Sequence, residues 1–509
     1  MTTRKRALDQ MAGKMNIRTA LFLSVACLYP AFATAQDNGP VETKQFDDGG
    51  IYEGTFVDGK PDGRGTYRLP NGFEYSGQWE DGEIRGTGVA RFLNGAVYEG
   101  NFEKSKPHGF GKISFASGGT YEGEWVDGAI TGTGVAVYAN GSRYEGEFLN
   151  ARHHGQGILT SPNGYIYDGM WVGGVKEGKG KVTYADGSTY EGGLQGGLRS
   201  GQGTLVSPDG LVYVGAWKNG QINGLGKLTQ PTGEVYEGLL VNGERHGTGK
   251  MLYANGDIYE GEFQNDHRQG TGTLTGSDGF AYVGGWLDGR IEGQGTVTYP
   301  DGTVFTGTFR DNLPDGTGAI TYTDGSTYEG EWRGGVIEGR GTATFADGMV
   351  YEGEFQNALF DGQGTSTLAN GDVYAGGWQM GKRHGQAVYT FADGSVLEGT
   401  FANGTVSGTA TYRGADGFIY DGEWQNMQFH GQGTATYPNG DVYEGTFENG
   451  MRQGQGTIRY AGGEVESGVW SNNLLTTRDG DAPSTDPVSP ETTEPETTEA
   501  EATEAAPAE

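Results

Sequence analysis

A pattern of tyrosine, any residue, glycine, any residue and an aromatic residue recurs every 23 residues from Tyr52 to Tyr443, with no insertion or deletion. The glycine is present in every copy, from Gly54 to Gly468, and only Phe305 and Leu397 replace the tyrosine over that span. A fixed period of this length is typical of a stacked repeat array, in which each unit contacts its neighbours, and not of a single globular core.

The second aromatic position of the pattern contains every tryptophan of the chain, namely Trp79, Trp125, Trp171, Trp217, Trp286, Trp332, Trp378, Trp424 and Trp470. Tryptophan alternates there with phenylalanine or leucine, and the alternation slips once, between Leu240 and Phe263. The slip indicates a joint near residue 250 between two duplicated blocks. We interpret this aromatic ladder chiefly as packing, because a thin sheet needs large side chains for contact area. The alternative is a row of exposed rings that binds a periodic glycan.

The tyrosine, the glycine and the second aromatic residue occupy alternate positions, so in a β-strand their side chains share one face. A second alternation follows a Gly-x-Gly in most units, as at Val297 and Tyr299, and predicts a second strand. The link after this second strand is Asn-Gly or Asp-Gly in 15 of 18 copies, which predicts a type I′ hairpin turn there and a looser loop after the first strand. We expect the rings of one repeat to lie across the glycine backbone of the next.

The strings YEGEW, Gly-x-Gly and Asn-Gly or Asp-Gly at this spacing resemble the MORN repeat, over Gly50 to about Trp470, in eighteen consecutive copies. The resemblance implies β-hairpin repeats in an elongated antiparallel sheet. It also implies roles in scaffolding, dimerisation or placement at membranes, with no catalysis by the repeats themselves. The expected fold class is therefore all-β: an elongated, twisted, single-layer antiparallel sheet of tandem β-hairpin repeats.

Outside the repeats, the two ends of the chain differ in composition. Residues 1–35 have the pattern of a signal peptide: basic residues, an apolar run, and Ala-Thr-Ala before Gln36. Residues 36–49 are expected to form a linker, residues 50–475 the array, and residues 476–509 a disordered acidic tail rich in Thr, Glu, Pro and Ala. The only cysteine, Cys27, lies in the leader, and Ser24 departs from the usual acylation box, so a lipid anchor is not favoured.

The charge of the chain excludes some classes of partner. The formal net charge is −31, and removing the leader would bring it to about −35. Binding to nucleic acid needs clustered lysine and arginine, so it is not expected. An anionic membrane surface is disfavoured for the same reason, although the family resemblance includes placement at membranes.

The chain lacks a residue pattern that indicates catalysis or metal binding. Five histidines share one position, just before the Gly-x-Gly, where we expect a loop; they are His108, His154, His246, His384 and His430. Identical placement in several copies is typical of a repeat consensus, and no companion ligands accompany them. We therefore expect no catalytic residue, no metal site and no cofactor.

Together these features predict a bacterial, exported, non-enzymatic MORN repeat scaffold, periplasmic or extracellular, that binds a protein partner through its extended sheet surface. End-to-end pairing of two copies into a homodimer is a secondary prediction. The alternative is a carbohydrate-binding module of the cell envelope that uses exposed tryptophan and tyrosine rings to bind glycan.

Overall fold

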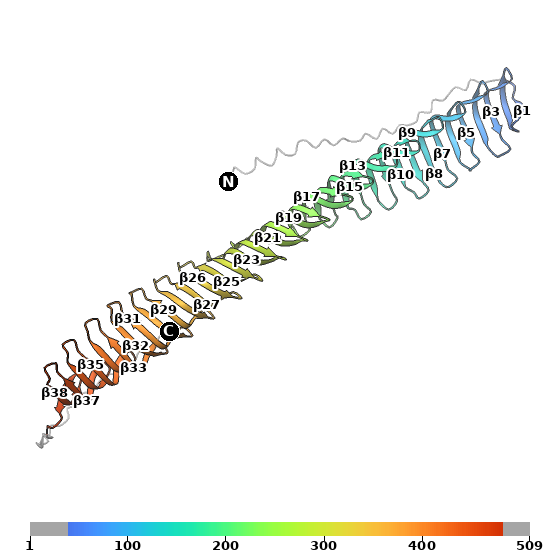
Figure 1. Ribbon diagram of the computed structural model, residues 1–509. Coiled ribbons are helices and arrows are strands. Elements are labelled where there is room, and N and C mark those ends of the chain that lie inside the picture. Colours follow the sequence, from blue (N-terminus) through green and yellow to red (C-terminus); the bar gives the residue numbers. More distant parts are fainter. Residues whose placement is uncertain (1–38, 482–509) are drawn as a thin grey trace, which may run out of the picture. The chain divides into compact units, whose positions relative to one another are not determined.

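All regular secondary structure in the computed structural model, which describes residues 39–481, is β-strand. The chain divides into two units, one ending at Leu198 and one beginning at Arg199. Within each unit, successive strands pair antiparallel in chain order and form an open sheet (Figure 1). The all-β, antiparallel architecture predicted from the sequence is confirmed. No helix in residues 39–481 is long and apolar enough to cross a bilayer.

The first unit contains fourteen strands: β1 (Glu42–Gln45), β2 (Ile51–Val57), β3 (Lys60–Arg68), β4 (Glu74–Glu80), β5 (Glu83–Arg91), β6 (Val97–Glu103), β7 (Lys106–Ser114), β8 (Gly119–Val126), β9 (Ala129–Tyr138), β10 (Arg143–Leu149), β11 (Arg152–Thr160), β12 (Ile166–Val172), β13 (Val175–Thr183) and β14 (Thr189–Gln195). The remaining strands belong to the second unit, apart from the first residue of β15: β15 (Leu198–Val206), β16 (Val212–Lys218), β17 (Gln221–Thr229), β18 (Val235–Val241), β19 (Glu244–Leu252), β20 (Ile258–Gln264), β21 (His267–Thr275), β22 (Ala281–Leu287), β23 (Arg290–Thr298), β24 (Val304–Arg310), β25 (Leu313–Thr321), β26 (Thr327–Arg333), β27 (Val336–Thr344), β28 (Val350–Gln356), β29 (Leu359–Thr367), β30 (Val373–Gln379), β31 (Lys382–Thr390), β32 (Val396–Ala402), β33 (Thr405–Arg413), β34 (Ile419–Gln425), β35 (Gln428–Thr436), β36 (Val442–Glu448), β37 (Met451–Arg459), β38 (Val465–Ser471) and β39 (Leu474–Arg478).

Each repeat is one hairpin, and β22 with β23 illustrates its register. Gly284 lies opposite Gly295, and Trp286 lies opposite Ile291. The register shifts between Gly284 and Trp286, where two steps along β22 correspond to four along β23, and this irregularity is a β-bulge. The tyrosine, the glycine and the tryptophan of β22 therefore face one side of the sheet, which we call the ring face. The other side is the open face.

The two links of each hairpin have turn types opposite to those predicted. After the first strand the chain reverses in two residues that both have positive φ, as at Asp58 (49°) and Gly59 (76°), and this is the type I′ turn. After the second strand the Asn-Gly or Asp-Gly closes a three-residue loop in which only the glycine is left-handed, as at Gly72 (φ 98°). There the Asn71 side-chain oxygen accepts a hydrogen bond from the N–H of Phe73.

The reason for this error is that the same dipeptide suits two turns. In the three-residue loop the Asn or Asp is selected as a hydrogen-bond acceptor, and only the following glycine needs a left-handed backbone. The tight turn gives a weaker sequence signal because its residues vary, and one repeat has Lys104 and Ser105 there with φ of 49° and 60°.

Replacing Ala358 by glycine should stabilise the protein by about 0.5–1 kcal/mol, since Ala358 occupies the second position of a tight turn with φ 61°. Most other repeats place glycine at this position. The matched control is Ala369→Gly, in the longer loop of the same hairpin, where φ is not positive and glycine should be mildly destabilising. Thermal denaturation of the two variants checks this, and equal shifts in Tm would contradict the turn assignment.

Tyrosine rings cover the glycines of their own repeat, so the expectation that they cover those of the next repeat is wrong. A Cβ atom on Gly295 would lie 2.4 Å from the Tyr282 hydroxyl oxygen, and one on Gly284 would lie 2.3 Å from the same atom. The ring leans along its own strand because Gly284 stands two residues away on the same face, directly opposite Gly295. The second aromatic residue makes the contact between repeats, as the 5.3 Å distance between the Trp286 and Tyr259 rings shows.

The sheet begins before residue 50 and ends after residue 475, the bounds predicted for the array. Part of the expected linker forms β1, which pairs with β2, and β39 continues to Arg478. Strand β1 is exposed and carries no tyrosine or glycine pattern, so its backbone pairing leaves no periodic signal in the sequence. The joint expected near residue 250 lies inside the second unit and stays a prediction. The signal peptide and most of the acidic tail lie outside the described residues.

Candidate binding groove

The tryptophan ladder lies on the ring face, packed between tyrosines. Trp286 is 4% exposed, and its ring is 5.3 Å from that of Tyr259 in the preceding repeat and 5.3 Å from that of Tyr282 in its own. In all nine copies the indole N–H donates to the backbone carbonyl fourteen residues earlier, in the preceding repeat, at 3.0–3.4 Å. All except Trp79 are buried. The indoles therefore join one repeat to the previous one.

The tyrosine hydroxyl has a role that the sequence pattern did not reveal. Each hydroxyl donates to the backbone carbonyl three residues later, at the bulge, as in the 3.0 Å bond from Tyr282 to Gly285. Burial raises the pKa of Tyr282 to about 12, so the phenol remains a donor at neutral pH. Phe305 occupies the same position without a hydroxyl and is equally buried.

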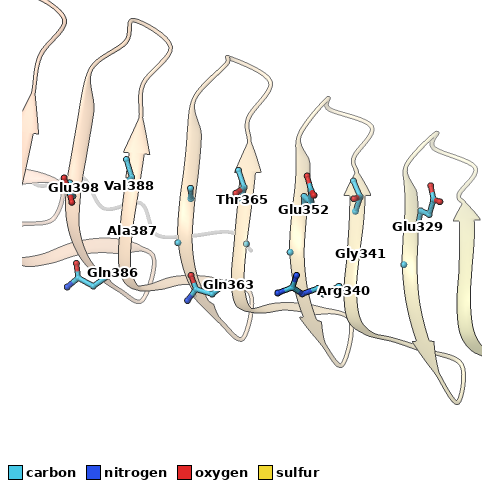
Figure 2. A pocket seen from close by; sticks show the side chains of 16 residues that line it. Glu329, Arg340, Gly341, Glu352, Gln363, Thr365, Gln386, Ala387, Val388 and Glu398 are labelled. Carbon is cyan, nitrogen blue, oxygen red and sulfur yellow. The ribbon is translucent and has the colours of Figure 1, made fainter.

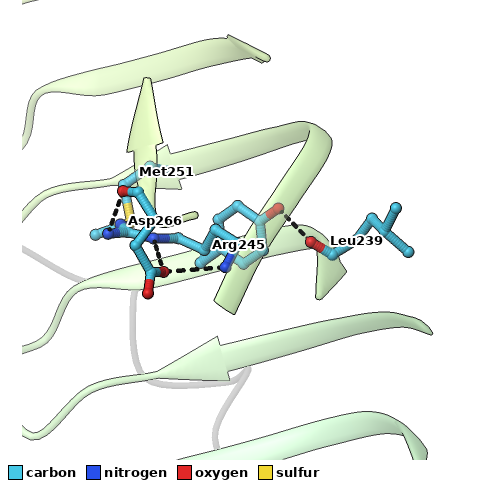
Figure 3. Close-up of polar contacts among 5 residues, drawn as sticks. Leu239, Arg245, Met251 and Asp266 are labelled. Atoms are coloured by element: carbon cyan, nitrogen blue, oxygen red, sulfur yellow. Dashed lines mark hydrogen bonds and ion pairs between the residues drawn. The ribbon is translucent and has the colours of Figure 1, made fainter. Parts of the chain in front are cut away.

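Basic side chains on the ring face bind adjacent repeats together. Arg245 donates from Nε to the Asp266 carboxylate at 2.9 Å and from Nη2 to the Asp266 carbonyl at 2.9 Å (Figure 3). Arg268 repeats the bond to the next tight turn, at Gly289 (2.8 Å), and its guanidinium lies 4.0 Å from the centre of the Trp286 ring. These cations are engaged with carbonyls and rings, so the ring face is not a free basic surface.

A histidine takes the place of these arginines in β11. His153 stacks on Tyr144 with ring centres 3.7 Å apart, and its Nε2 lies 2.5 Å from the Tyr138 hydroxyl. Phe148 and Trp171 complete its surroundings. Burial lowers the pKa of His153 to about 4, because a charged imidazole would lose its hydration among these rings.

His153→Phe should remove part of the pH dependence of stability. The folded pKa of about 4 lies below the ordinary value of 6.5, so only the unfolded state takes up this proton as the pH falls through that window. The wild type therefore loses stability on acidification. Phenylalanine fits, because Phe360 stacks on Tyr351 at 3.8 Å in the same position. The difference in Tm between variant and wild type should widen from pH 7 to pH 4.5, and a constant difference would contradict this assignment.

A shallow groove of about 1120 Å³ runs along the open face of the second unit, across β26 to β32 (Figure 2). Its floor is backbone at the paired positions Gly330–Gly341, Gly353–Gly364 and Gly376–Ala387, whose Cβ positions point to the ring face. Figure 2 shows one wall formed by Glu329, Glu352 and Glu398 and the opposite wall by Arg340, Gln363 and Gln386. Each wall repeats once per hairpin.

The carboxylates of the groove have no cationic partner among residues 39–481. Glu352 faces Thr342 and Thr365 on the neighbouring strands, and Glu398 faces Val388 and Thr411. Arg340 is the only base in the walls, and it lies 3.5 Å from Glu354, outside the groove lining. The groove is therefore acidic.

Elsewhere in the described chain, the acid that directly follows the tyrosine of the repeat often forms an ion pair. Lysines or an arginine pair with the acids in four other repeats, at 2.5–3.4 Å: Lys112 with Glu122, Arg143 with Glu145, Lys227 with Glu237, and Lys250 with Glu260. Uncompensated charge is thus a property of some repeats and not of every repeat: it holds for the segment 329–398 and continues at Asp421 and Glu444, which face only threonines.

The first unit has a groove of the same construction, of about 640 Å³, over β3 to β7. Its floor contains Gly77 and Gly88, and its walls contain Arg64, Glu99 and Phe110, so its charge is more balanced. The recurrence shows that the groove follows from the repeat, because the glycine positions recur in each hairpin. Sequence reasoning assigned these glycines to ring packing and missed the groove that the rows of side chains on either side of them form on the open face.

The five histidines of the repeat consensus lie in second strands and not in loops, because the preceding turn is only two residues long. His154 in β11 and His430 in β35 are examples. No cluster of three or more metal-ligating side chains occurs in the part of the chain that the structure describes.

Some solved structures are similar to parts of this chain, at low identity. The TCP10 domain of Danio rerio CPAP is 17% identical, with 47% of this chain and 96% of that domain covered and a TM-score of 0.22. The TCP10c domain of Drosophila melanogaster Sas-4 is 17% identical, covering 38% and 96%, with a TM-score of 0.17. Virginiamycin B lyase from Staphylococcus aureus is 13% identical, covering 57% and 93%, with a TM-score of 0.10. Such low scores carry no functional argument. Comparison with curated proteins gave no match.

The family model of the MORN repeat matches most of the array, in seventeen copies: residues 52–73, 75–97, 98–120, 121–143, 144–164, 167–189, 190–212, 213–235, 236–258, 259–280, 282–304, 305–327, 328–350, 351–373, 374–396, 420–442 and 443–465. The copy between the matches 374–396 and 420–442 begins with Leu397 in place of tyrosine and has Ala410 in place of a glycine, yet it forms the same hairpin. With more than half of its residues matched, the chain belongs to the MORN repeat family.

Proposed function

We propose that this MORN repeat protein is an exported, non-enzymatic scaffold that binds a protein partner through the open face of its sheet. The observation that carries the proposal is the glycine-floored groove, which recurs in both units and has walls that repeat with the hairpins. A repeating surface of this kind presents many equivalent contacts to a long partner and no enclosed cavity for a small substrate.

The packing of the ring face also favours the open face as the binding surface. The tyrosines of the 23-residue pattern and nearly all of the tryptophans are buried against neighbouring repeats, so these rings are used to hold the array together. Sugar binding through the ladder would require exposed ring faces, whereas the open face offers exposed polar side chains such as Thr365 and Gln363.

Photocrosslinking from defined positions tests this function. A benzophenone amino acid at Thr365, on the open face, should crosslink a protein partner in the cells that make this protein. The same group at Tyr322, which is exposed on the ring face, is the control and should give little product. Absence of any protein adduct from Thr365 and from other open-face positions would refute the proposal. In the same cells, a mature N-terminus at Gln36 is the expected result for export, and an intact leader would contradict it.

A further inference from the structure

We propose that the groove over residues 329–398 binds an extended basic polypeptide segment in which a lysine or arginine recurs at every third residue. This deepens the proposed protein-binding function, on which it rests, by giving the partner a charge and a spacing. The segment would run across the strands, from hairpin to hairpin, with its cations toward the glutamate wall.

The distance between equivalent wall residues of successive hairpins sets the spacing of the cations in the bound segment. Each hairpin contributes two strands at about 4.8 Å, so equivalent wall residues recur roughly every 9.6 Å. A polyproline II helix advances about 9.3 Å per turn of three residues, which places every third side chain on the same side. A β-strand does not match, because a three-residue repeat would place successive cations on opposite faces.

The charge of the groove selects a cationic partner. Glu329, Glu352 and Glu398 are exposed and have no lysine or arginine partner within residues 39–481. The third hairpin of this segment has Ala375 at the equivalent position, so the wall presents three carboxylates over four hairpins. An added cation gains more in this segment than in the repeats that neutralise this position with their own lysines.

The floor and the opposite wall fit the backbone of such a segment. The floor at Gly353 and Gly364 presents only backbone, because the Cβ positions of these residues point to the ring face, and the amides of Gln363 and Gln386 line the other side. A polyproline II chain has no internal hydrogen bonds, so its carbonyls are free to accept from such amides.

A spacing-matched peptide pair provides the probe. One fluorescent peptide consists of about four Pro-Pro-Lys triplets, a length that spans the groove, and its isomer has the same residues with all lysines placed first. Anisotropy titration of the full chain at low salt should show several-fold tighter binding of the triplet peptide. The triple variant Glu329→Thr, Glu352→Thr and Glu398→Thr should weaken that binding roughly tenfold. Threonine is compatible with the fold, because Thr306 occupies this position in another hairpin.

The matched control is a second triple variant, which removes three glutamates from the same position of the repeat outside the groove. Its substitutions are Glu122→Thr, Glu237→Thr and Glu260→Thr, at acids already paired with lysines, and it should leave the affinity within about twofold of the wild type. Circular dichroism melts of both triple variants confirm that they are folded. Equal binding of the two peptides, equal loss in the two triple variants, or no binding would each overturn the inference. Such a failure would leave the scaffold function standing if Thr365 still crosslinks a protein partner.

Discussion

Gly261→Ala is expected to reduce the local stability of the hairpin formed by β20 and β21 by about 2–4 kcal/mol. A Cβ atom at this position would lie 2.5 Å from the Tyr259 hydroxyl oxygen and 2.6 Å from the Gly272 Cα atom. The second contact is with backbone on the paired strand, which cannot move without breaking the ladder of hydrogen bonds. Hydrogen exchange of the amides in these two strands measures the local free energy of opening.

Gly272→Ala is the matched control and should cost less. The three atoms nearest to a Cβ atom there all belong to the ring of Tyr259, which is a side chain that can shift. The chain itself accepts alanine at this position, as Ala387 opposite Gly376 and as Ala410 opposite Gly399. Equal destabilisation by the two substitutions would show that the ring, and not the close approach of the two backbones, makes glycine necessary.

Trp286→Ala is expected to lower the stability of its hairpin and of the preceding one by about 3–5 kcal/mol. The indole fills the space between Tyr259 and Tyr282, and its N–H bonds to the Gly272 carbonyl at 3.2 Å. Removing it leaves a cavity and an unpaired carbonyl between two repeats. Because each repeat of an array is stabilised by its neighbours, the loss should concentrate at this interface and can be mapped by hydrogen exchange.

Trp286→Phe separates packing from the hydrogen bond. Phenylalanine occupies the same position in the adjacent repeats, where Phe309 lies 5.4 Å from Tyr282 and Phe263 lies 5.1 Å from Tyr259. This variant should therefore cost only about 1 kcal/mol, the usual net value of one hydrogen bond. A glycan-binding role for the ladder would instead predict that Trp286→Ala abolishes sugar binding with little effect on stability, and fluorescence titration together with the exchange data distinguishes the two outcomes.

Side-chain periodicity predicted which positions of the repeat line the candidate groove, but it did not predict the charge of the groove. The two glycine positions per hairpin were visible in the sequence, and so was the alternation that places Glu352 on the face opposite Tyr351. The acidic character of one segment was not visible, because it depends on which residues face each other across strands. Glu260 faces Lys250, whereas Glu352 faces Thr342 and Thr365, and only the register reveals that difference.

The sequence by itself determined the class of fold, the two strands per repeat and the face that each aromatic residue occupies, because these depend on spacing along one strand. The tertiary structure decided the turn types, the pairing of β1, and the choice of glycine that each ring covers. Those features depend on backbone angles and on contacts between strands, and one dipeptide such as Asn71-Gly72 is compatible with more than one of them. The groove belongs to the second group, since it exists only where the register aligns the open-face side chains of several hairpins.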